Sequence, residues 1–237
     1  MELKSYGKLM EDHILNVDFL ECFRRGIAEV VYDSEQALLV RVNGGSIFFH
    51  MGSGEEGRKA LSDVKPGPEG FCLVVARDND IRDYLINERG YRFHEGCYQA
   101  VYDKKEPVPT EGRITLRNPD PCDFELFNST YEIGDEDMKR EAFAKPDFFG
   151  GYADGKLVGF VGIHNEGAMG YLFVAPEYRG MGYAREMQAM LMNRLISEGA
   201  YPYGQIYESN EASLKLQRKM GLTISDDMIY WLWKGTD

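Results

Sequence analysis

A glycine-rich segment at residues 174–184 has residue types and a spacing that suit the binding of an anion. It reads Val-Ala-Pro-Glu-Tyr-Arg-Gly-Met-Gly-Tyr-Ala. The first turn of a helix exposes backbone N–H groups without intrahelical partners, and the helix dipole adds partial positive charge there. Gly180, Gly182 and Ala184 would leave such groups accessible, and Arg179 adds a permanent cation with forked donors. We therefore predict a phosphate-binding turn here.

Such a turn needs a strand before it and a helix after it. Met169–Val174 is predicted to be a strand that Pro176 ends. A helix over Tyr183–Ser197 follows, with Gly199 as its C-terminal cap. Its apolar residues recur at spacings of three and four and form one stripe: Ala184, Met187, Leu191 and Leu195.

The rest of the chain alternates short strands and helices. The second half is predicted to have strands at 113–117, 148–153, 156–163, 204–207 and 228–233, and helices at 122–131 and 210–220. The first half is predicted to have strands at 37–42, 46–51, 71–76 and 93–102, and helices at 55–64 and 78–89. This order predicts an α/β (α+β) fold with a mixed, mostly antiparallel central sheet flanked by helices.

The two halves share a helix signature. Asn79 precedes Gly90 by 11 residues, and Asn210 precedes Gly221 by 11. A polar segment with two prolines, Lys104–Gly112, lies between the halves. We therefore predict two tandem, related halves, the first one eroded, with domains at 1–106 and 107–237.

Two landmarks in the second half resemble the signature of the GNAT superfamily of N-acetyltransferases. The first is the 174–184 segment, and the second is the run Asn210–Leu222. The resemblance extends from about Arg113 to Lys234. Its Leu-Gln ending at 216–217 and the Tyr-Trp-Leu at 230–232 are similar to the glycine N-acyltransferase branch. It implies the GNAT fold and transfer of an acetyl (acyl) group from acetyl-CoA, as co-substrate and without a metal, to a primary amine of a small molecule or peptide.

The resemblance also implies the CoA contacts. Backbone N–H groups of the turn would hold the pyrophosphate, the preceding strand would pair with the pantetheine arm, and the second landmark would lie near the arm or the thioester. The residues of the turn are Arg179, Gly180, Met181, Gly182, Tyr183 and Ala184. Those of the strand are Leu172, Phe173 and Val174, and those of the second landmark are Asn210 and Ser213.

Direct attack on a thioester needs an unprotonated amine, and therefore a base. We expect Glu166 to be that base, with His164 as the second candidate. Both also have an ordinary interpretation, because a carboxylate in a turn is often merely solvated and a lone histidine is often structural. The N–H of Val174 is the expected donor to the oxyanion.

The leaving thiolate is where this sequence departs from the family pattern. Gln217 stands where many members carry a tyrosine acid, and an amide donates no useful proton. Either the thiolate leaves unaided, or Tyr207 or Tyr183 substitutes, or the activity is weak. The departure keeps a second class open, a CoA-binding regulatory module without catalysis. An interaction protein is a third alternative.

A weaker alternative is a dinucleotide site. Residues 52–57 fit G-x-G-x-x-G, and Asp78 lies 21 residues beyond Gly57. However, Glu55 and Glu56 would place negative charge against a pyrophosphate. In the tandem interpretation this segment is the eroded counterpart of 179–184.

Composition restricts the partners. A net charge of −12 disfavours nucleic acid and weakly favours cationic partners such as protonated amines. No apolar run approaches the ~20 residues of a membrane span, and the N-terminus has no apolar signal region, so we expect a cytoplasmic protein without a membrane partner. Four scattered cysteines are expected to be reduced, and four histidines show no metal-ligand spacing. The sequence leaves a homodimer open.

Overall fold

The computed structural model describes residues 3–67, 70–132 and 134–235. The chain forms two compact units. The first comprises residues 1–101, 205–218 and 222–237, and the second comprises 102–204 and 219–221. These units are defined by compactness rather than by descent, so the tandem halves divided after residue 106 stay a prediction.

The first unit is built on a seven-stranded sheet in the order β1-β2-β3-β4-β11-β5-β10. Neighbouring strands are antiparallel in the pairs β1–β2, β2–β3, β4–β11 and β5–β11, whereas β3 and β4 run parallel. The strands are β1 (Ala28–Asp33), β2 (Leu38–Val42), β3 (Ile47–Met51), β4 (Cys72–Ala76), β5 (Arg92–Val101), β10 (Tyr203–Tyr207) and β11 (Thr223–Lys234).

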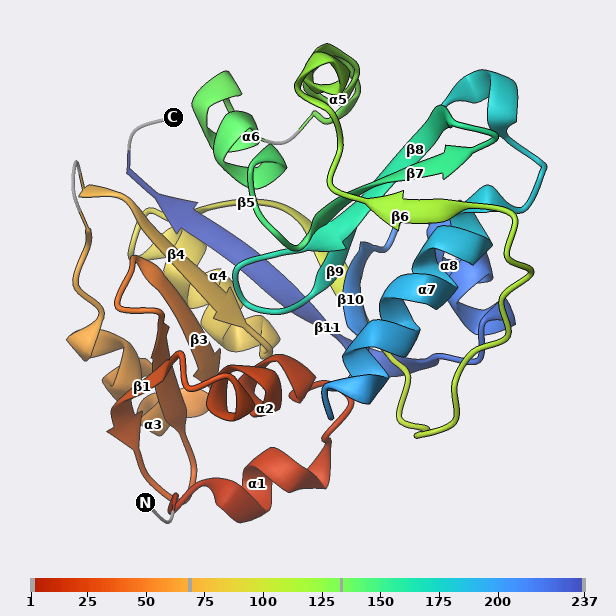
Figure 1. Ribbon diagram of the computed structural model, residues 1–237. Helices are drawn as coiled ribbons and strands as arrows, with labels where there is room; N and C mark the ends of the chain where they lie inside the picture. The colour runs from red at the N-terminus through yellow and green to blue at the C-terminus, as the bar shows by residue number, and fades with distance from the viewer. Residues whose placement is uncertain (1–2, 68–69, 133, 236–237) are drawn as a thin grey trace. The chain divides into compact units, whose positions relative to one another are not determined.

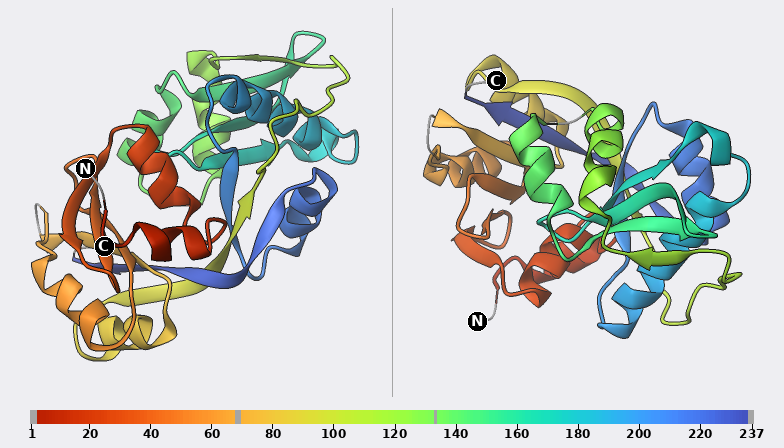
Figure 2. Two further views of the ribbon diagram at one scale, coloured as in Figure 1. Left: turned by 90° about the horizontal axis from the view of Figure 1, so that it is seen from below. Right: turned by 45° about the horizontal axis from the view of Figure 1, so that its top comes forward.

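Helices cover both faces of this sheet (Figure 2, left). The side chains of a strand alternate between the two faces of its sheet. Leu38 and Val40 therefore pack on one face, against a first pair of helices, and Leu39 packs on the other face, against a second pair. The first pair is α1 (Tyr6–Glu11) and α2 (Val17–Arg24), and the second is α3 (Gly54–Ala60) and α4 (Asn79–Asn87). A further helix, α8 (Glu211–Lys219), lies between β10 and β11 in the chain.

The second unit contains a four-stranded antiparallel sheet in the order β6-β7-β8-β9 (Figure 1). The strands are β6 (Thr115–Arg117), β7 (Phe148–Ala153), β8 (Lys156–Ile163) and β9 (Met169–Val174). Because β9 ends this order, one side of it faces no strand of its own sheet.

Opposite faces of this sheet carry different helices. Helix α7 (Tyr183–Ser197) packs where glycine leaves room, since a Cβ added to Gly159 would lie 3.0 Å from Cε of Met187. The other face carries an aromatic cluster in which Phe148 and Phe160 meet Phe127 at ring-centroid distances of 4.7 and 5.8 Å. Phe127 belongs to α5 (Phe124–Thr130), which is followed by α6 (Glu136–Phe143). The sheet is therefore sandwiched between helices.

The fold class predicted from the sequence is confirmed. The strands at 148–153, 156–163 and 169–174 and the helix at 183–197 have the predicted bounds. The last strand is longer than the predicted 228–233, because β11 continues from Thr223 through a break in register between Ile224 and Met228. Helices α1, α2 and α6 and strand β1 were not predicted. In the described ranges, no helix has both the length and the apolarity of a membrane span.

Candidate functional site

The segment from Arg179 to Ala184, called here the 179–184 turn, joins β9 to α7 through a short 3-10 helix, Pro176–Tyr178. Gly180 and Gly182 have φ values of 79° and 85°, in the left-handed region where a side chain costs energy. Gly182 is the N-cap of α7, and the N–H of Glu186 bonds its carbonyl at 3.1 Å. The amides of residues 183–185 therefore precede the helical ladder and point outward from the helix start.

Arg179 is exposed and anchored to the end of β9. Its Nε donates to the carbonyl of Val174 at 3.1 Å. The charge predicted for the turn therefore stands beside the last residue of the strand.

A second arginine, Arg113, also contacts the turn, and it was not predicted as a site residue. Its Nη1 donates to the carbonyl of Met181 at 2.7 Å, and its Cζ lies 5.6 Å from the centre of the Tyr183 ring. A Cβ added to Gly182 would lie 2.7 Å from Nη2 of Arg113. Arg113 and Met181 are 68 positions apart in the sequence. No local pattern could have signalled the contact.

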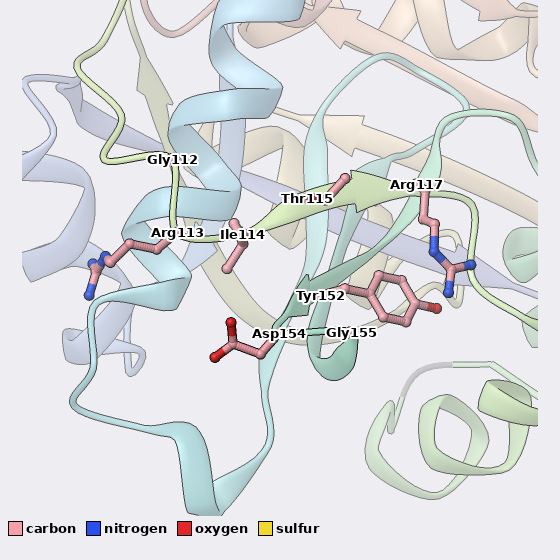
Figure 3. Close-up of a pocket in the computed structure, with 8 residues that line it drawn as sticks. All are labelled: Gly112, Arg113, Ile114, Thr115, Arg117, Tyr152, Asp154 and Gly155. Atoms are coloured by element: carbon pink, nitrogen blue, oxygen red, sulfur yellow. The ribbon is translucent and has the colours of Figure 1, made fainter.

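A surface hollow of about 410 Å³ adjoins Arg113 (Figure 3). Burial is the main cause that raises the pKa of the Tyr152 phenol to about 12, and its hydrogen bond to Asp123 adds to it. The Arg117 guanidinium covers the Tyr152 ring at 3.8 Å. The hollow is lined by Gly112, Arg113, Ile114, Thr115, Arg117, Tyr152, Asp154 and Gly155.

Strand β9 offers backbone groups on its outer side. The N–H of Ala175 bonds the carbonyl of Val158 at 3.0 Å. Residues alternate in direction along an antiparallel ladder, so the N–H and C=O of Val174 point away from β8. Leu172 and Phe173 are half-buried in the same strand, and the Phe173 ring stacks against Phe160.

A bulge interrupts β9 just before these residues. Phe160 pairs with Phe173 and Gly162 with Gly170, so Tyr171 and Leu172 together oppose one residue of β8. Tyr171 has a φ of 56°, a strained value for a bulky residue. Its ring packs against Phe127 and Tyr131, at 5.9 and 5.2 Å, and this packing opposes relaxation of the strain.

The two candidate bases follow β8. His164 stacks on Tyr171 with ring centroids 4.2 Å apart, and burial, with a smaller effect of Lys145, lowers its pKa to about 4. Glu166 is 6% exposed, and its backbone carbonyl accepts a hydrogen bond from the Tyr203 hydroxyl at 3.1 Å. Burial, followed by the charge of Glu166, raises the pKa of Tyr171 to about 12. The second unit therefore brings His164, Glu166 and Tyr171 together.

The remaining predicted residues belong to the first unit. Tyr207 is 36% exposed, and burial is the main cause that raises its pKa, followed by the charges of Cys97 and Glu95. Asn210 caps α8, because its Oδ1 accepts from the N–H of Ser213 at 3.1 Å. This local role was missed from the sequence, where both residues were predicted to contact the cofactor.

Gln217 is 6% exposed and lies on α8. In the described part of the chain, no cluster of histidine, cysteine and carboxylate side chains has the geometry of a metal site.

Comparison with known proteins gives one family match. Residues 116–222 match the model described as "Acetyltransferase (GNAT) family". This range contains the 179–184 turn, β7 to β10 and α8. No curated protein sequence matches the chain.

Solved structures resemble the whole chain in fold. A protein from Drosophila superposes with a TM-score of 0.62 at 12% identity, covering 98% of this chain and 86% of its own. A GCN5-related N-acetyltransferase from Kribbella flavida gives 0.57 at 11% identity, with coverages of 93% and 96%. A GCN5-related N-acetyltransferase-like protein from Streptococcus suis gives 0.53 at 16% identity, covering 98% of both chains. At these identities the likeness establishes the fold.

Proposed function

Residues 116–222 form an acetyltransferase domain of the GNAT family, and from this premise we propose that the protein is an N-acyltransferase that uses acetyl-CoA. In this proposal it transfers the acetyl group to a primary amine of a small molecule or peptide. Membership of the family supports acyl transfer from an acyl-CoA to an acceptor. The donor, the acceptor and the roles of individual residues are the proposed part.

The 179–184 turn is the observation that carries the proposal. Its outward amides, its two left-handed glycines and the nearby Arg179 suit a diphosphate. CoA carries a diphosphate between its nucleotide and its pantetheine arm. The amides would hold that group in place while the thioester end reacts elsewhere.

The outer side of β9 suits the pantetheine arm, because this arm contains amides that can pair with a strand. Val174 is central to this step, since its N–H points away from β8 as argued above. The same N–H could donate to the oxygen of the thioester as it becomes negatively charged. We therefore propose that Leu172, Phe173 and Val174 align the arm.

In the proposed reaction the amine nitrogen attacks the thioester carbon. A C–N bond forms, the C–S bond breaks, and the electron pair leaves on sulfur as CoA thiolate. The ammonium proton goes to a base, directly or through water. Glu166 is our first candidate, because a nearly buried carboxylate adds a negative charge that attracts the ammonium substrate, and His164 is the second candidate.

No strong acid is required for the thiolate, because the unperturbed pKa of a thiol is about 8.5. Tyr207 keeps its proton at neutral pH, since burial raises its pKa, so it remains a candidate donor. Asn210 and Ser213 would contact the cofactor only through groups that the cap of α8 does not use.

The test is the release of free CoA thiol from acetyl-CoA, with and without a panel of primary amines. We expect amine-dependent release. Glu166→Gln should lower kcat by about 10²-fold or more. Glu141→Gln is the matched control, because the charge of Glu141 also raises the pKa of Tyr171, but the Glu141 side chain is exposed. Equal activity of both variants would remove Glu166 from the mechanism.

A second function is favoured by one residue. Gln217 stands at the position of the family's tyrosine acid and is buried in α8. A protein that binds CoA without turnover would be a regulatory module. Tight CoA binding with no thiol release across a broad amine panel would select that alternative.

A further inference from the structure

Arg113 is presented to the 179–184 turn by a segment fastened to the start of α7. Glu186, in the first turn of α7, is 1% exposed. Its carboxylate accepts hydrogen bonds from the N–H of Glu111, at 2.9 Å, and of Gly112, at 2.6 Å. A buried carboxylate with charge-assisted bonds of this kind is a firm anchor. The backbone just before Arg113 is therefore fixed to the helix that follows the turn.

The Arg113 side chain binds one peptide group of the turn. Its guanidinium donates to the carbonyl of Met181, and in a trans peptide the following N–H points the opposite way. The N–H concerned belongs to Gly182. Holding the Met181 carbonyl therefore sets the direction of the Gly182 N–H, and a cation on the carbonyl side also strengthens that N–H as a donor.

The fit between Arg113 and the turn depends on glycine. A Cβ at Gly182 would come within 2.7 Å of Nη2 of Arg113. The absence of a side chain at 182 thus serves two purposes: it permits the left-handed φ of 85°, and it gives Arg113 room to reach Met181. Stacking near the Tyr183 ring further limits how the guanidinium can move.

We propose that Arg113 is a positioning residue of the CoA site, which orients the Gly182 N–H so that it acts together with the amides of residues 183–185 on a diphosphate. This inference rests on the proposed function. Arg113 acts through the peptide between Met181 and Gly182. Its ion pair with Glu111, at 2.9 Å, is exposed and adds little to folding stability. Affinity and stability should therefore respond differently to its loss.

The experiment compares wild type, Arg113→Gln, Arg113→Lys and Arg117→Gln. Arg117 is the matched control, because it lies on the same stretch of chain and has a similarly exposed side chain paired to Asp120. In Figure 3 the two arginine side chains point in different directions from their backbone. The Kd for CoA is measured by titration calorimetry, and kcat and KM for acetyl-CoA are measured with an amine that the wild type accepts.

We expect Arg113→Gln to raise the Kd for CoA and the KM for acetyl-CoA about 10-fold while kcat stays within about 2-fold. Arg113→Lys, which keeps a donor for the Met181 carbonyl, should recover about half of the loss on a logarithmic scale. Arg117→Gln should leave Kd and KM unchanged. This split between KM and kcat would not arise from general destabilisation.

Three results would overturn the inference. If wild type binds CoA and Arg113→Gln binds it equally well, the role of Arg113 fails and the proposed function survives. If Arg117→Gln loses as much affinity as Arg113→Gln, the effect is one of general charge rather than positioning. If wild type itself does not bind CoA, the proposed function fails and the inference fails with it.

Discussion

Two glycine-rich turns in this chain follow a strand and precede a helix, yet they use their glycines differently. In the 52–57 turn of the first unit, glycine makes room for packing. A Cβ at Gly52 would lie 2.8 Å from Cβ of Ala37, and one at Gly57 would lie 2.9 Å from the backbone of Gly52. In the 179–184 turn, Gly180 has nothing within 4 Å of such a Cβ. The crowded glycines of the first turn meet Ala37 and the turn's own backbone, whereas in the second turn the close group is the Arg113 side chain, 2.7 Å from a Cβ added to Gly182.

The charged groups beside the two turns also differ. The carbonyl of Gly57 accepts a hydrogen bond from Nε2 of the buried His50, 2.9 Å away, and the first turn of α3 carries Glu55 and Glu56. The 179–184 turn instead has Arg179 and Arg113 beside it. The negative charge of the first turn would repel a diphosphate, whereas the cations of the second attract one.

The neighbouring strands complete the contrast. In the first unit β3 pairs with β2 along Ile47–Met51 and with β4 along Ile47–Phe49, so most of the strand before the turn is paired on both sides. In the second unit β9 ends its sheet. A glycine-rich strand-to-helix turn is therefore a candidate site only when the strand before it has backbone groups left for a ligand.

The largest effect is expected from the buried ion pair of the first unit. The side chains of Asp18 and Arg77 are 0% and 4% exposed, and Nη1 of Arg77 also donates to the carbonyl of His50. Asp18→Ala leaves the cation buried alone and should lower the free energy of unfolding by about 3–5 kcal/mol. Chemical denaturation measures this, and the folded fraction should bind CoA as wild type does.

A double variant, Asp18→Leu with Arg77→Met, should recover most of that stability, because no charge is left buried. If Asp18→Ala were as stable as wild type and weakened CoA binding instead, the first unit would hold a ligand and the contrast between the turns would collapse.

The pH dependence of stability should also arise in the first unit. Burial is the main cause that lowers the pKa of His50 to about 4, from an unfolded value of 6.5. The unfolded chain therefore binds the proton more readily than the fold does. The stabilisation is fully present above pH 6.5 and is lost as pH falls from 6.5 towards 4. His50 alone should contribute a loss of about 2–3 kcal/mol by pH 4.5 in urea unfolding, and His164 of the second unit, whose pKa is lowered in the same way, should add to it.

His50→Asn removes this titration and should lower the slope of the stability curve between pH 6.5 and 4.5 by about half, because the buried His164, whose pKa is also lowered to about 4, still titrates. A curve that keeps the wild-type slope in this variant would assign the pH dependence to other groups.

The sharpest test of the comparison uses two glycines in similar surroundings. Gly54 and Gly180 have φ values of 56° and 79°, and neither has any atom within 4 Å of an added Cβ. A glutamate should strain both backbones by about 1–2 kcal/mol. Only Gly180→Glu should also weaken CoA binding, by about 100-fold, because its charge and bulk meet the diphosphate.

Calorimetric titration of both variants with CoA measures the difference. Equal losses at the two positions would mean that strain, and not the location of the site, governs affinity.

The smallest effect is expected from the cation of the turn. Arg179→Gln should raise the Kd for CoA about 10-fold at low salt and less at high salt, because the charge is exposed. Arg58→Gln, on α3 of the first unit, should change nothing. Titrations at two ionic strengths check both variants. If the loss of CoA affinity in Arg179→Gln did not depend on salt, Arg179 would act by its hydrogen bond to the Val174 carbonyl and not by its charge.

Local pattern was enough to predict β7, β8, β9 and α7, because alternation and a helical stripe are properties of neighbouring residues. It also located the glycines at 180 and 182, whose left-handed φ values follow from the strand-to-helix turn. It did not predict Arg113, because the bond to Met181 joins segments 68 residues apart. The bulge at Tyr171 was missed for a related reason. It is held by aromatic packing against Phe127 of α5, which is distant in the sequence.

The N-terminal elements were missed because they are short. Helix α1 has six residues and α2 has eight, and both depend on tertiary packing of residues such as Leu9 and Phe19 rather than on a long periodic stripe. Asn210 shows the converse case, in which a residue assigned to the cofactor by resemblance has an evident local use as a helix cap.

One titration tests directly whether the 179–184 turn binds CoA. The intact protein and the Gly182→Glu variant are titrated with CoA by calorimetry, and thermal unfolding of both is recorded at each CoA concentration. We expect one site per chain, a Tm that rises with CoA, and loss of both in the variant. Absence of binding, two equivalent sites, or an undiminished affinity of Gly182→Glu would contradict it.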